Sequence, residues 1–400
     1  MSDLQKAWAK NRLQAMPTEA FDELQEEEET GTVSELPEHI DDDSSSASSA
    51  SSTGTIIPSP SQNLFARPQG APRGRTYQPI PWTTYFEREL YLHDEASPES
   101  PTTHAYLTSP VGKGPLFVMH HGGGSSGLSF AVVGDQIRKR LSSAGILSID
   151  ARGHGSTTTA AGQALDLSLG TLADDLLAAL ELTRREMRWA EMPPVILVGH
   201  SMGGAVVTEL ARSGRLGSAL LGYAVLDVVE GSAIDATRHM NTYLATRPQG
   251  FPSVESGIEW HMRTRTIRNP ASARTSVPSL LALDDRDPAD ARPWKWRTDL
   301  AATEPFWENW FLGLSSKFLG ARGGKLLLLA GTDRLDTELT IGQMQGKYNL
   351  QVFPEAGHFI HEDLPEKTAI SLVDFYRRND RSALVLPPKV SDLLKQGKKV

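Results

Sequence analysis

Short apolar runs alternate with longer amphipathic stretches from about residue 81 onward. Helical periodicity follows Phe130 and Ser201 and extends across Thr171–Arg188 and Pro365–Arg378. The apolar runs predict strands at Leu116–His120, Gly145–Asp150, Val195–Gly199, Gly222–Asp227, Lys325–Ala330 and Leu350–Phe353. Strands that alternate with helices predict an α/β fold with a mostly parallel central sheet. Such strands are continuously apolar because helices flank both faces of the sheet.

One connection departs from this alternation. The 97 residues between Asp227 and Lys325 contain no strong strand pattern, and a structureless loop of that length is uncommon in a compact domain. We therefore expect a helical cap inserted at about residues 230–323. It holds five of the chain's eight tryptophans, most of which we expect in the cap's own core and one or two beside a substrate groove. Asn269–Pro293, rich in Pro, Ser, Ala and Asp, is predicted to be a mobile loop.

The charge is concentrated at one end of the chain. Residues 1–60 carry 13 acidic and three basic side chains, whereas the other 340 residues are nearly neutral. With a serine-rich run and scattered prolines, residues 1–75 are predicted to be a disordered tail. The α/β domain is expected at 76–385, with a short basic tail at 386–400.

Composition narrows the class of protein further. The chain has no cysteine, which excludes disulfide and thiolate chemistry and favours a reducing compartment. No apolar run reaches the roughly 20 residues that span a bilayer, and the N-terminus lacks a signal-peptide pattern. No basic groove indicates a nucleic-acid partner. We expect a soluble cytoplasmic or nuclear protein without a membrane partner.

The segment Gly199–Gly203 reads G-H-S-M-G and lies between a predicted strand and a predicted helix. In that context it predicts a nucleophile elbow, a sharp turn that holds the Ser201 hydroxyl above the sheet. Glycines flank the serine because the turn packs too tightly for side chains. The following helix directs free N–H groups and the positive end of its dipole at the same place. Ser201 is the candidate nucleophile.

A serine nucleophile needs a base to accept its proton and an acid to orient that base. His358 follows the last predicted strand, in a G-H-F-I-H-E-D-L-P segment typical of the histidine loop of α/β-hydrolases. His361 is a competitor, but it lies nearer the start of the final helix, and we interpret it as structural. His358 is therefore the candidate base.

An oxyanion hole needs two backbone N–H groups aimed at the developing negative charge. Met202, directly after the nucleophile, supplies one of them. The H-H-G-G-G segment after the first predicted strand supplies the other; we favour Gly123 as this donor, with its neighbours Gly122 and Gly124 as alternatives. The Asp150–Gly155 segment also holds Asp, Arg and His, but we interpret it as a structural turn near the site.

Two aspartates are candidates for the acid. Asp333 follows the strand that precedes the histidine, and Asp227 ends the strand after the nucleophile helix. Both obey the chain order Ser, Asp, His, and either strand end can reach the imidazole. The residues by themselves leave this choice open.

At these motifs the chain resembles the eukaryotic protein phosphatase methylesterase family. The resemblance covers roughly residues 79–378, and its D-V-V-E-G and T-I-G-Q-M-Q-G-K runs are not general hydrolase features. The matching segments are Pro79–Trp82, Tyr85–Phe86, His121–Gly124, Gly199–Gly204, Leu226–Gly231, Arg247–Pro248, Ile258–Trp260, Ile267–Asn269, Gly331–Asp336 and Leu339–Lys347.

The resemblance implies an α/β-hydrolase fold and a serine carboxylesterase. Its substrate would be the methyl ester on the C-terminal leucine of the catalytic subunit of type 2A protein phosphatase, with that enzyme's scaffold or regulatory subunits as further partners. The resemblance also implies Asp227 as the acid, and no metal or organic cofactor. We expect the triad to be poorly aligned in the free enzyme and to tighten when the phosphatase docks.

Two other functions fit parts of the sequence. A lipase-like or small-ester hydrolase would use the same fold and triad, because fold does not decide function. A phosphatase-binding inhibitor with little turnover would need the cap but not the triad. Turnover of a generic ester compared with that of the methylated phosphatase distinguishes the three.

Overall fold

The computed structural model describes residues 77–97, 99–160, 162–331, 335–380 and 382. The tails predicted at 1–75 and at 386–400, and the candidate acid Asp333, lie outside these residues. The described residues belong to a compact unit that begins at Thr76.

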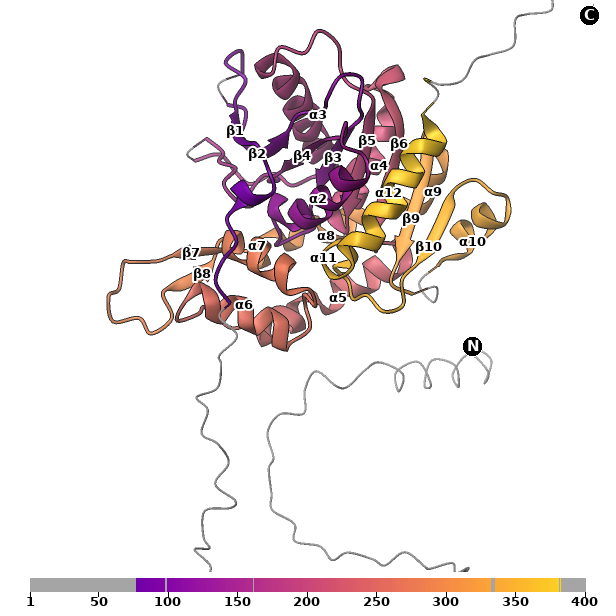
Figure 1. The fold of residues 1–400 in the computed structure, drawn as a ribbon. Coiled ribbons are helices and arrows are strands. Elements are labelled where there is room, and N and C mark those ends of the chain that lie inside the picture. The colour runs from indigo at the N-terminus through magenta and orange to yellow at the C-terminus, as the bar shows by residue number, and fades with distance from the viewer. Residues whose placement is uncertain (1–76, 98, 161, 332–334, 381, 383–400) are drawn as a thin grey trace, which may run out of the picture. The chain divides into compact units, whose positions relative to one another are not determined.

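The described residues form an eight-stranded sheet at the centre of this unit (Figure 1). β2 is antiparallel to β1 and β4, and all other neighbours are parallel. The parallel part was predicted, whereas β1 and β2 were missed because polar residues interrupt their short apolar patterns. In sheet order the strands are β1 (Arg88–Leu92), β2 (Thr103–Thr108), β4 (Gly145–Ile149), β3 (Leu116–His120), β5 (Val195–His200), β6 (Leu220–Leu226), β9 (Gly324–Leu329) and β10 (Asn349–Val352).

Helices cover both faces of the sheet, as the apolar strands require. α2 (Ala131–Arg140) and α12 (Pro365–Asn379) pack on one face, where β5 contributes Ile196 and Val198. α3 (Leu169–Glu186) and α4 (Met202–Ser213) share the other face with the alternate residues of β5. Because both clusters are fully buried, β5 is fixed in the middle of the sheet, and its carboxyl end is a rigid support for the residue that follows.

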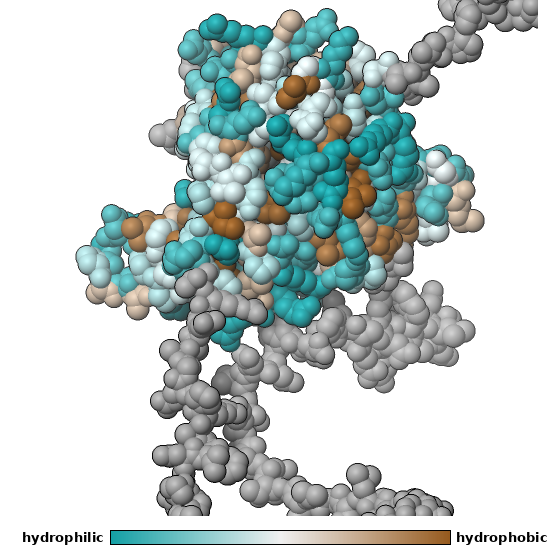
Figure 2. All heavy atoms as spheres, viewed as in Figure 1, coloured by the Kyte–Doolittle hydropathy of each residue, from teal (hydrophilic) through white to brown (hydrophobic). Residues whose placement is uncertain are grey.

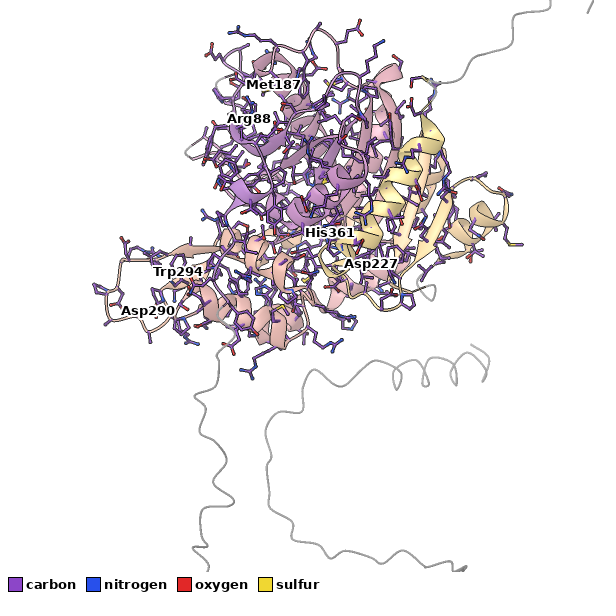
Figure 3. The ribbon with its side chains drawn as sticks, in the orientation of Figure 1. Arg88, Met187, Asp227, Asp290, Trp294 and His361 are labelled. Atoms are coloured by element: carbon purple, nitrogen blue, oxygen red, sulfur yellow. The ribbon has the colours of Figure 1, made fainter. Side chains whose placement is uncertain are left out.

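The long connection between β6 and β9 contains mostly short helices, together with a two-stranded hairpin. The hairpin extends away from the central sheet and carries Trp294 and Asp290 (Figure 3). In chain order the elements are α5 (Glu230–Thr246), α6 (Val254–Arg263), α7 (Pro270–Leu280), β7 (Leu281–Leu283), β8 (Trp294–Trp296), η5 (Ala301–Phe306), α8 (Trp307–Phe311) and α9 (Leu314–Gly320). The remaining described elements are η2 (Trp82–Thr84), η3 (Gly127–Phe130), η4 (Gly217–Ala219), α10 (Thr337–Met344) and α11 (Ile360–Asp363).

The insertion has a small core of its own. Phe251, Ile258, Val277 and their neighbours are buried there, and three of the five tryptophans pack around them. The other two, Trp307 and Trp310, belong to the main core beside α4. The insertion is thus partly self-supporting and partly an extension of the main domain.

The mobile loop predicted at Asn269–Pro293 is wrong for its first half, which forms α7. The Asn269 side chain caps this helix by accepting hydrogen bonds from the N–H groups of Ala271 and Ser272, at 2.9 and 3.2 Å. Pro270 occupies the first helical position, where a missing N–H costs nothing. Ala273 and Val277, four residues apart, bury one face of α7 in the insertion's core. The small polar residues that indicated a loop therefore start a helix.

Hydrophobic residues form small separated areas on the face drawn in Figure 2. The large apolar side chains that are exposed lie in different segments of the chain, among them Tyr91, Val111, Leu312 and Met344. None of the helices in the described part of the chain has the length and apolarity to cross a membrane.

Glu230, the glutamate of the D-V-V-E-G run, joins the two ends of the insertion. It is the first residue of α5, and its carboxylate accepts hydrogen bonds from the N–H groups of Gly313 and Ser315, at 2.8 and 3.1 Å. These N–H groups belong to the start of α9, where a helix leaves its first donors unpaired. One carboxylate thereby ties the beginning of the insertion to its end.

Replacing Glu230 with alanine should lower the free energy of unfolding by about 1.5–3 kcal/mol, because hydrogen bonds to a charged acceptor are lost. Urea denaturation of the Glu230→Ala variant measures this change. Glu259, exposed on α6, provides the control variant Glu259→Ala. Equal midpoints for the two variants would contradict a stabilising role for this link.

Candidate active site

Ser201 occupies a strained turn between β5 and α4. Its backbone has φ = 51° and ψ = −120°, a conformation that a residue with a side chain rarely adopts. A Cβ at Gly199 would lie 2.1 Å from the Gly203 carbonyl oxygen, and one at Gly203 would lie 2.1 Å from the carbonyl oxygen of His120. Glycine is therefore required on both sides, as the sequence pattern predicted, and Ser201 is held at the carboxyl end of the sheet.

Asp227 and His358 are brought together from distant parts of the chain. His358 Nδ1 lies 2.8 Å from Asp227 Oδ2, and the other carboxylate oxygen accepts the Ala330 N–H at 2.9 Å. The Asp227 side chain is fully buried, whereas that of His358 is 46% exposed. A hydrogen bond to a carboxylate requires the proton on Nδ1, so Nε2 is left as an acceptor. This is the tautomer that a general base needs.

Ser201 lies next to this pair, because its N–H donates to the carbonyl of Leu226, which precedes Asp227, at 3.1 Å. Among the residues that the structure describes, no hydrogen bond joins the Ser201 hydroxyl to His358. His200 supports the histidine instead: its Nε2 donates to the His358 carbonyl at 2.9 Å. Burial, together with the neighbouring His358, lowers the pKa of His200 well below its ordinary value, so this ring stays neutral.

The glycine-rich loop after β3 lies between the elbow and the insertion. The Gly124 N–H donates to His154 Nε2 at 2.9 Å and is therefore not available to a substrate. The N–H groups of Gly123 and Met202 have no acceptor among the described residues, and the same holds for Gly122. A side chain at Gly123 would lie 3.5 Å from Leu300 and 3.8 Å from Trp310, both in the insertion.

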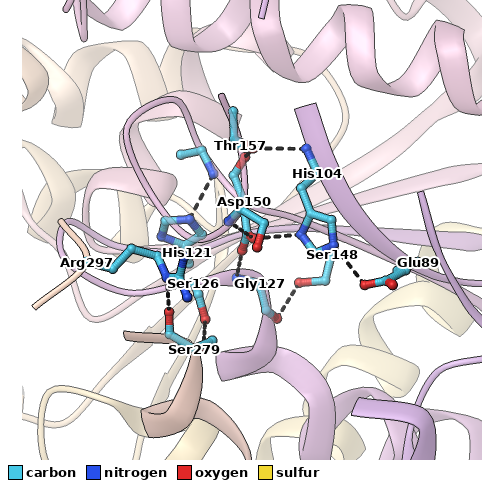
Figure 4. Close-up of polar contacts among 12 residues, drawn as sticks. Glu89, His104, His121, Ser126, Gly127, Ser148, Asp150, Thr157, Ser279 and Arg297 are labelled. Atoms are coloured by element: carbon cyan, nitrogen blue, oxygen red, sulfur yellow. Dashed lines mark hydrogen bonds and ion pairs between the residues drawn. The ribbon is translucent and has the colours of Figure 1, made fainter. Parts of the chain in front are cut away.

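A buried polar network holds this loop (Figure 4). The Asp150 carboxylate accepts hydrogen bonds from His104 Nδ1 and from the Gly127 N–H, both at 2.7 Å. His121 Nε2 accepts a hydrogen bond from the Ala151 N–H at 2.9 Å. Its Nδ1 donates a hydrogen bond to the Gly122 carbonyl at 2.7 Å. The segment that begins at Asp150, which we interpreted as a structural turn, therefore orients the peptide groups of the loop.

The histidine loop also contains a second, buried imidazole. His361, the competing candidate base, is fully buried and stacks on Phe130 with ring centroids 4.3 Å apart. Burial lowers its pKa to about 3, so it is uncharged at neutral pH. Figure 3 marks His361 and Asp227 near the carboxyl ends of the strands. Within the described residues, no group of three or more potential ligands is arranged to hold a metal ion.

Sequence reasoning missed His200, His121 and His154 as supports of the site. Each has a signal in hindsight, because each adjoins a glycine at or just after the end of a strand. A histidine there can hydrogen-bond to nearby backbone without titrating, since burial lowers the pKa of all three. The amino-acid sequence by itself does not distinguish such a supporting histidine from a catalytic one.

A serine turn of this kind above a mostly parallel sheet defines an α/β hydrolase. Residues 117–370 match the model of the family described as "Alpha/beta hydrolase family". Among solved structures, E-2-(acetamidomethylene)succinate hydrolase has the same fold. It gives a TM-score of 0.55 at 18% identity, with 72% of this chain and 98% of that one covered.

Three curated relatives are considerably more similar, and each is named protein phosphatase methylesterase 1. The protein from Gibberella zeae is 70% identical and that from Neurospora crassa 64%, each over the full length of both chains. The protein from Schizosaccharomyces pombe is 44% identical over 77% of this chain and 87% of its own. The chain therefore belongs to the protein phosphatase methylesterase family, and it is a carboxylic ester hydrolase.

Glu362 gives the site a testable pH dependence. Its buried carboxyl accepts a hydrogen bond from Ser276 of α7 at 2.5 Å, and burial raises its pKa to about 8. The folded state therefore holds a proton that the unfolded chain releases above about pH 4.5. As the pH rises from about 5 to 8, the contribution of Glu362 to the free energy of unfolding decreases by up to ~1.4 kcal/mol per pH unit. Above pH 8 this contribution is lost completely.

The Glu362→Gln variant cannot lose a proton, so its stability relative to the wild type should rise with pH between 5 and 8. Thermal unfolding midpoints at several pH values measure the difference. Glu338→Gln, at an exposed position on α10, is the control. Parallel curves for the wild type and the Glu362→Gln variant would rule out a proton on Glu362.

Proposed function

We propose that this chain removes the methyl ester from the C-terminal leucine of the catalytic subunit of type 2A protein phosphatase. Support comes from the relatives, which carry the name protein phosphatase methylesterase 1 at up to 70% identity over the whole chain. The observation that carries the mechanism is the 2.8 Å hydrogen bond between His358 and Asp227. It involves the aspartate of the D-V-V-E-G run, where the family resemblance is most specific.

In the proposed reaction, Ser201 Oγ attacks the ester carbonyl and His358 Nε2 accepts its proton. Asp227 orients the imidazole and stabilises the imidazolium. The carbonyl oxygen becomes an oxyanion that accepts hydrogen bonds from the N–H groups of Gly123 and Met202. Collapse of this intermediate breaks the bond to the methoxy group, which leaves as methanol with the proton from His358.

The second half of the reaction repeats these roles with water. His358 removes a proton from the water, and the resulting hydroxide attacks the acyl group on Ser201. The second oxyanion collapses, and the Ser201 oxygen leaves with the proton returned by His358. The products are the free C-terminal carboxylate and the original enzyme, and every step uses the chain's own side chains and backbone.

Methanol is too small to provide specificity, so recognition must come from the rest of the phosphatase. The insertion is the suitable element, because Leu300 and Trp310 adjoin Gly123. The unformed hydrogen bond between Ser201 and His358 fits a triad that tightens when the phosphatase docks. The phosphatase's scaffold or regulatory subunits are further candidate partners, and we propose a cytoplasmic or nuclear location.

Substitution of the two candidate acids tests the mechanism. With methylated phosphatase as substrate, Asp227→Asn should lower kcat by about 10⁴-fold, because the imidazole loses its orienting carboxylate. Asp333→Asn should retain turnover, and Ser201→Ala should have none above background. If Asp333→Asn abolishes turnover while Asp227→Asn does not, the acid is Asp333.

A comparison of substrates tests the specificity. We expect kcat/KM for methylated phosphatase to exceed that for a small methyl ester such as N-acetylleucine methyl ester, because binding energy away from the ester positions the reacting carbonyl. The leaving group is the same in both substrates, and methanol release measures both reactions. An equal or higher kcat/KM for the small methyl ester would favour a general esterase. Tight binding of the phosphatase without methanol release would favour an inhibitor.

A further inference from the structure

A residue of the insertion binds the turn that immediately precedes His358. Arg268, between α6 and α7, donates from Nη1 to the carbonyl of Glu355 at 2.6 Å. Its backbone N–H donates to Asp363 Oδ1 at 2.8 Å, and its Nε lies 3.6 Å from Asp363 Oδ2. Asp363 Oδ2 also accepts the N–H of Gly357 at 2.7 Å.

These contacts fix the turn immediately before the predicted base. The carbonyl of Glu355 and the N–H of Gly357 are both held, one by Arg268 and the other by Asp363. A Cβ at Gly357 would lie 3.1 Å from the Asp363 carboxylate and 3.2 Å from Arg268 Nη2. Arg268 therefore lies directly against the backbone that precedes His358, with no layer of other side chains between them.

The Asp363 carboxylate links the insertion, at Arg268, to the turn before His358, at Gly357. Its side chain is 1% exposed, whereas that of Arg268 is 34% exposed. Burial raises the pKa of Asp363. The hydrogen bonds from the N–H groups of Arg268 and Gly357, and the positive charge of the Arg268 guanidinium, act in the opposite direction and lower it. A buried carboxylate that spans two backbone donors is a rigid connection, since losing either bond leaves a buried polar group unpaired.

We propose that Arg268 is a positioning residue for His358, so that the insertion sets the placement of the base. The inference rests on the proposed function, in which His358 is the base. His358 has a hydrogen bond to Asp227 through its ring and one to His200 through its carbonyl. The Arg268–Asp363 pair adds a third restraint, the one that originates in the insertion.

Hydrolysis of a small aryl acetate by the full chain tests this role, because such an ester needs no contacts with a phosphatase. The Arg268→Ala variant should lower kcat about 10- to 100-fold with little change in KM, since small misplacements of a catalytic group cost that much. Arg268→Lys should recover part of the loss, because an ammonium can still donate to Glu355. A low-field proton NMR signal from the His358–Asp227 hydrogen bond should weaken in Arg268→Ala.

Arg138 provides a matched control. It is 27% exposed and donates from Nη1 to the Ala144 carbonyl at 2.6 Å, but it lies on α2. Arg138→Ala should keep kcat and the low-field signal even where its thermal midpoint falls. The proposal is overturned if Arg268→Ala keeps both, or if its loss of kcat only follows the fraction of folded protein.

His358→Ala, measured in the same assay, separates this inference from the proposed function. Without its base the enzyme should show no turnover above background. If His358→Ala retains turnover, the proposed mechanism fails and the role of Arg268 fails with it. If His358→Ala is inactive while Arg268→Ala behaves like the wild type, only the positioning role fails.

Discussion

The close approach of backbone at Ser201 is the constraint on which the rest of the site depends. Gly203 packs against the carbonyl of His120, so the start of α4 and the end of β3 are pressed together. That contact places the glycine-rich loop beside the serine, and it is possible only because β5 is buried between two layers of helices. The strain at Ser201 is sustained by the packing of the whole sheet.

The insertion is attached to this frame by polar contacts at several places. Glu230 closes its two ends, the Ser126 and Ser279 hydroxyl oxygens lie 2.5 Å apart between the glycine-rich loop and α7, and Arg268 reaches the histidine loop. Polar contacts of this kind are directional and can be exchanged without unfolding a core. The small hydrophobic cluster within the insertion keeps α6, α7 and the hairpin together, whereas Trp307 and Trp310 anchor its last part in the main core.

The sequence predicts the parallel strands, the serine turn and the family because these depend on local patterns and short motifs. It predicts neither the antiparallel edge formed by β1 and β2 nor the helix that begins at Asn269. Edge strands carry mixed polar and apolar residues, and α7 is stabilised by a cap and by contacts from elsewhere in the insertion. The pairing of Arg268 with Asp363, 95 residues apart, is likewise a property of the fold and leaves no local pattern.

Burial of so many imidazoles ties the active site to the acid stability of the molecule. Burial lowers the pKa of five histidines near the site: His120 to about 4 and His361 to about 3, with His121, His154 and His200 also below the ordinary value. Each contributes stability above about pH 6.5 that is lost as the pH falls toward its folded-state pKa, because the unfolded chain takes up the proton first. These rings lie in the glycine-rich loop, the Asp150–Gly155 segment, the serine turn and the histidine loop, so the packing that shapes the site is also the packing that acid destabilises.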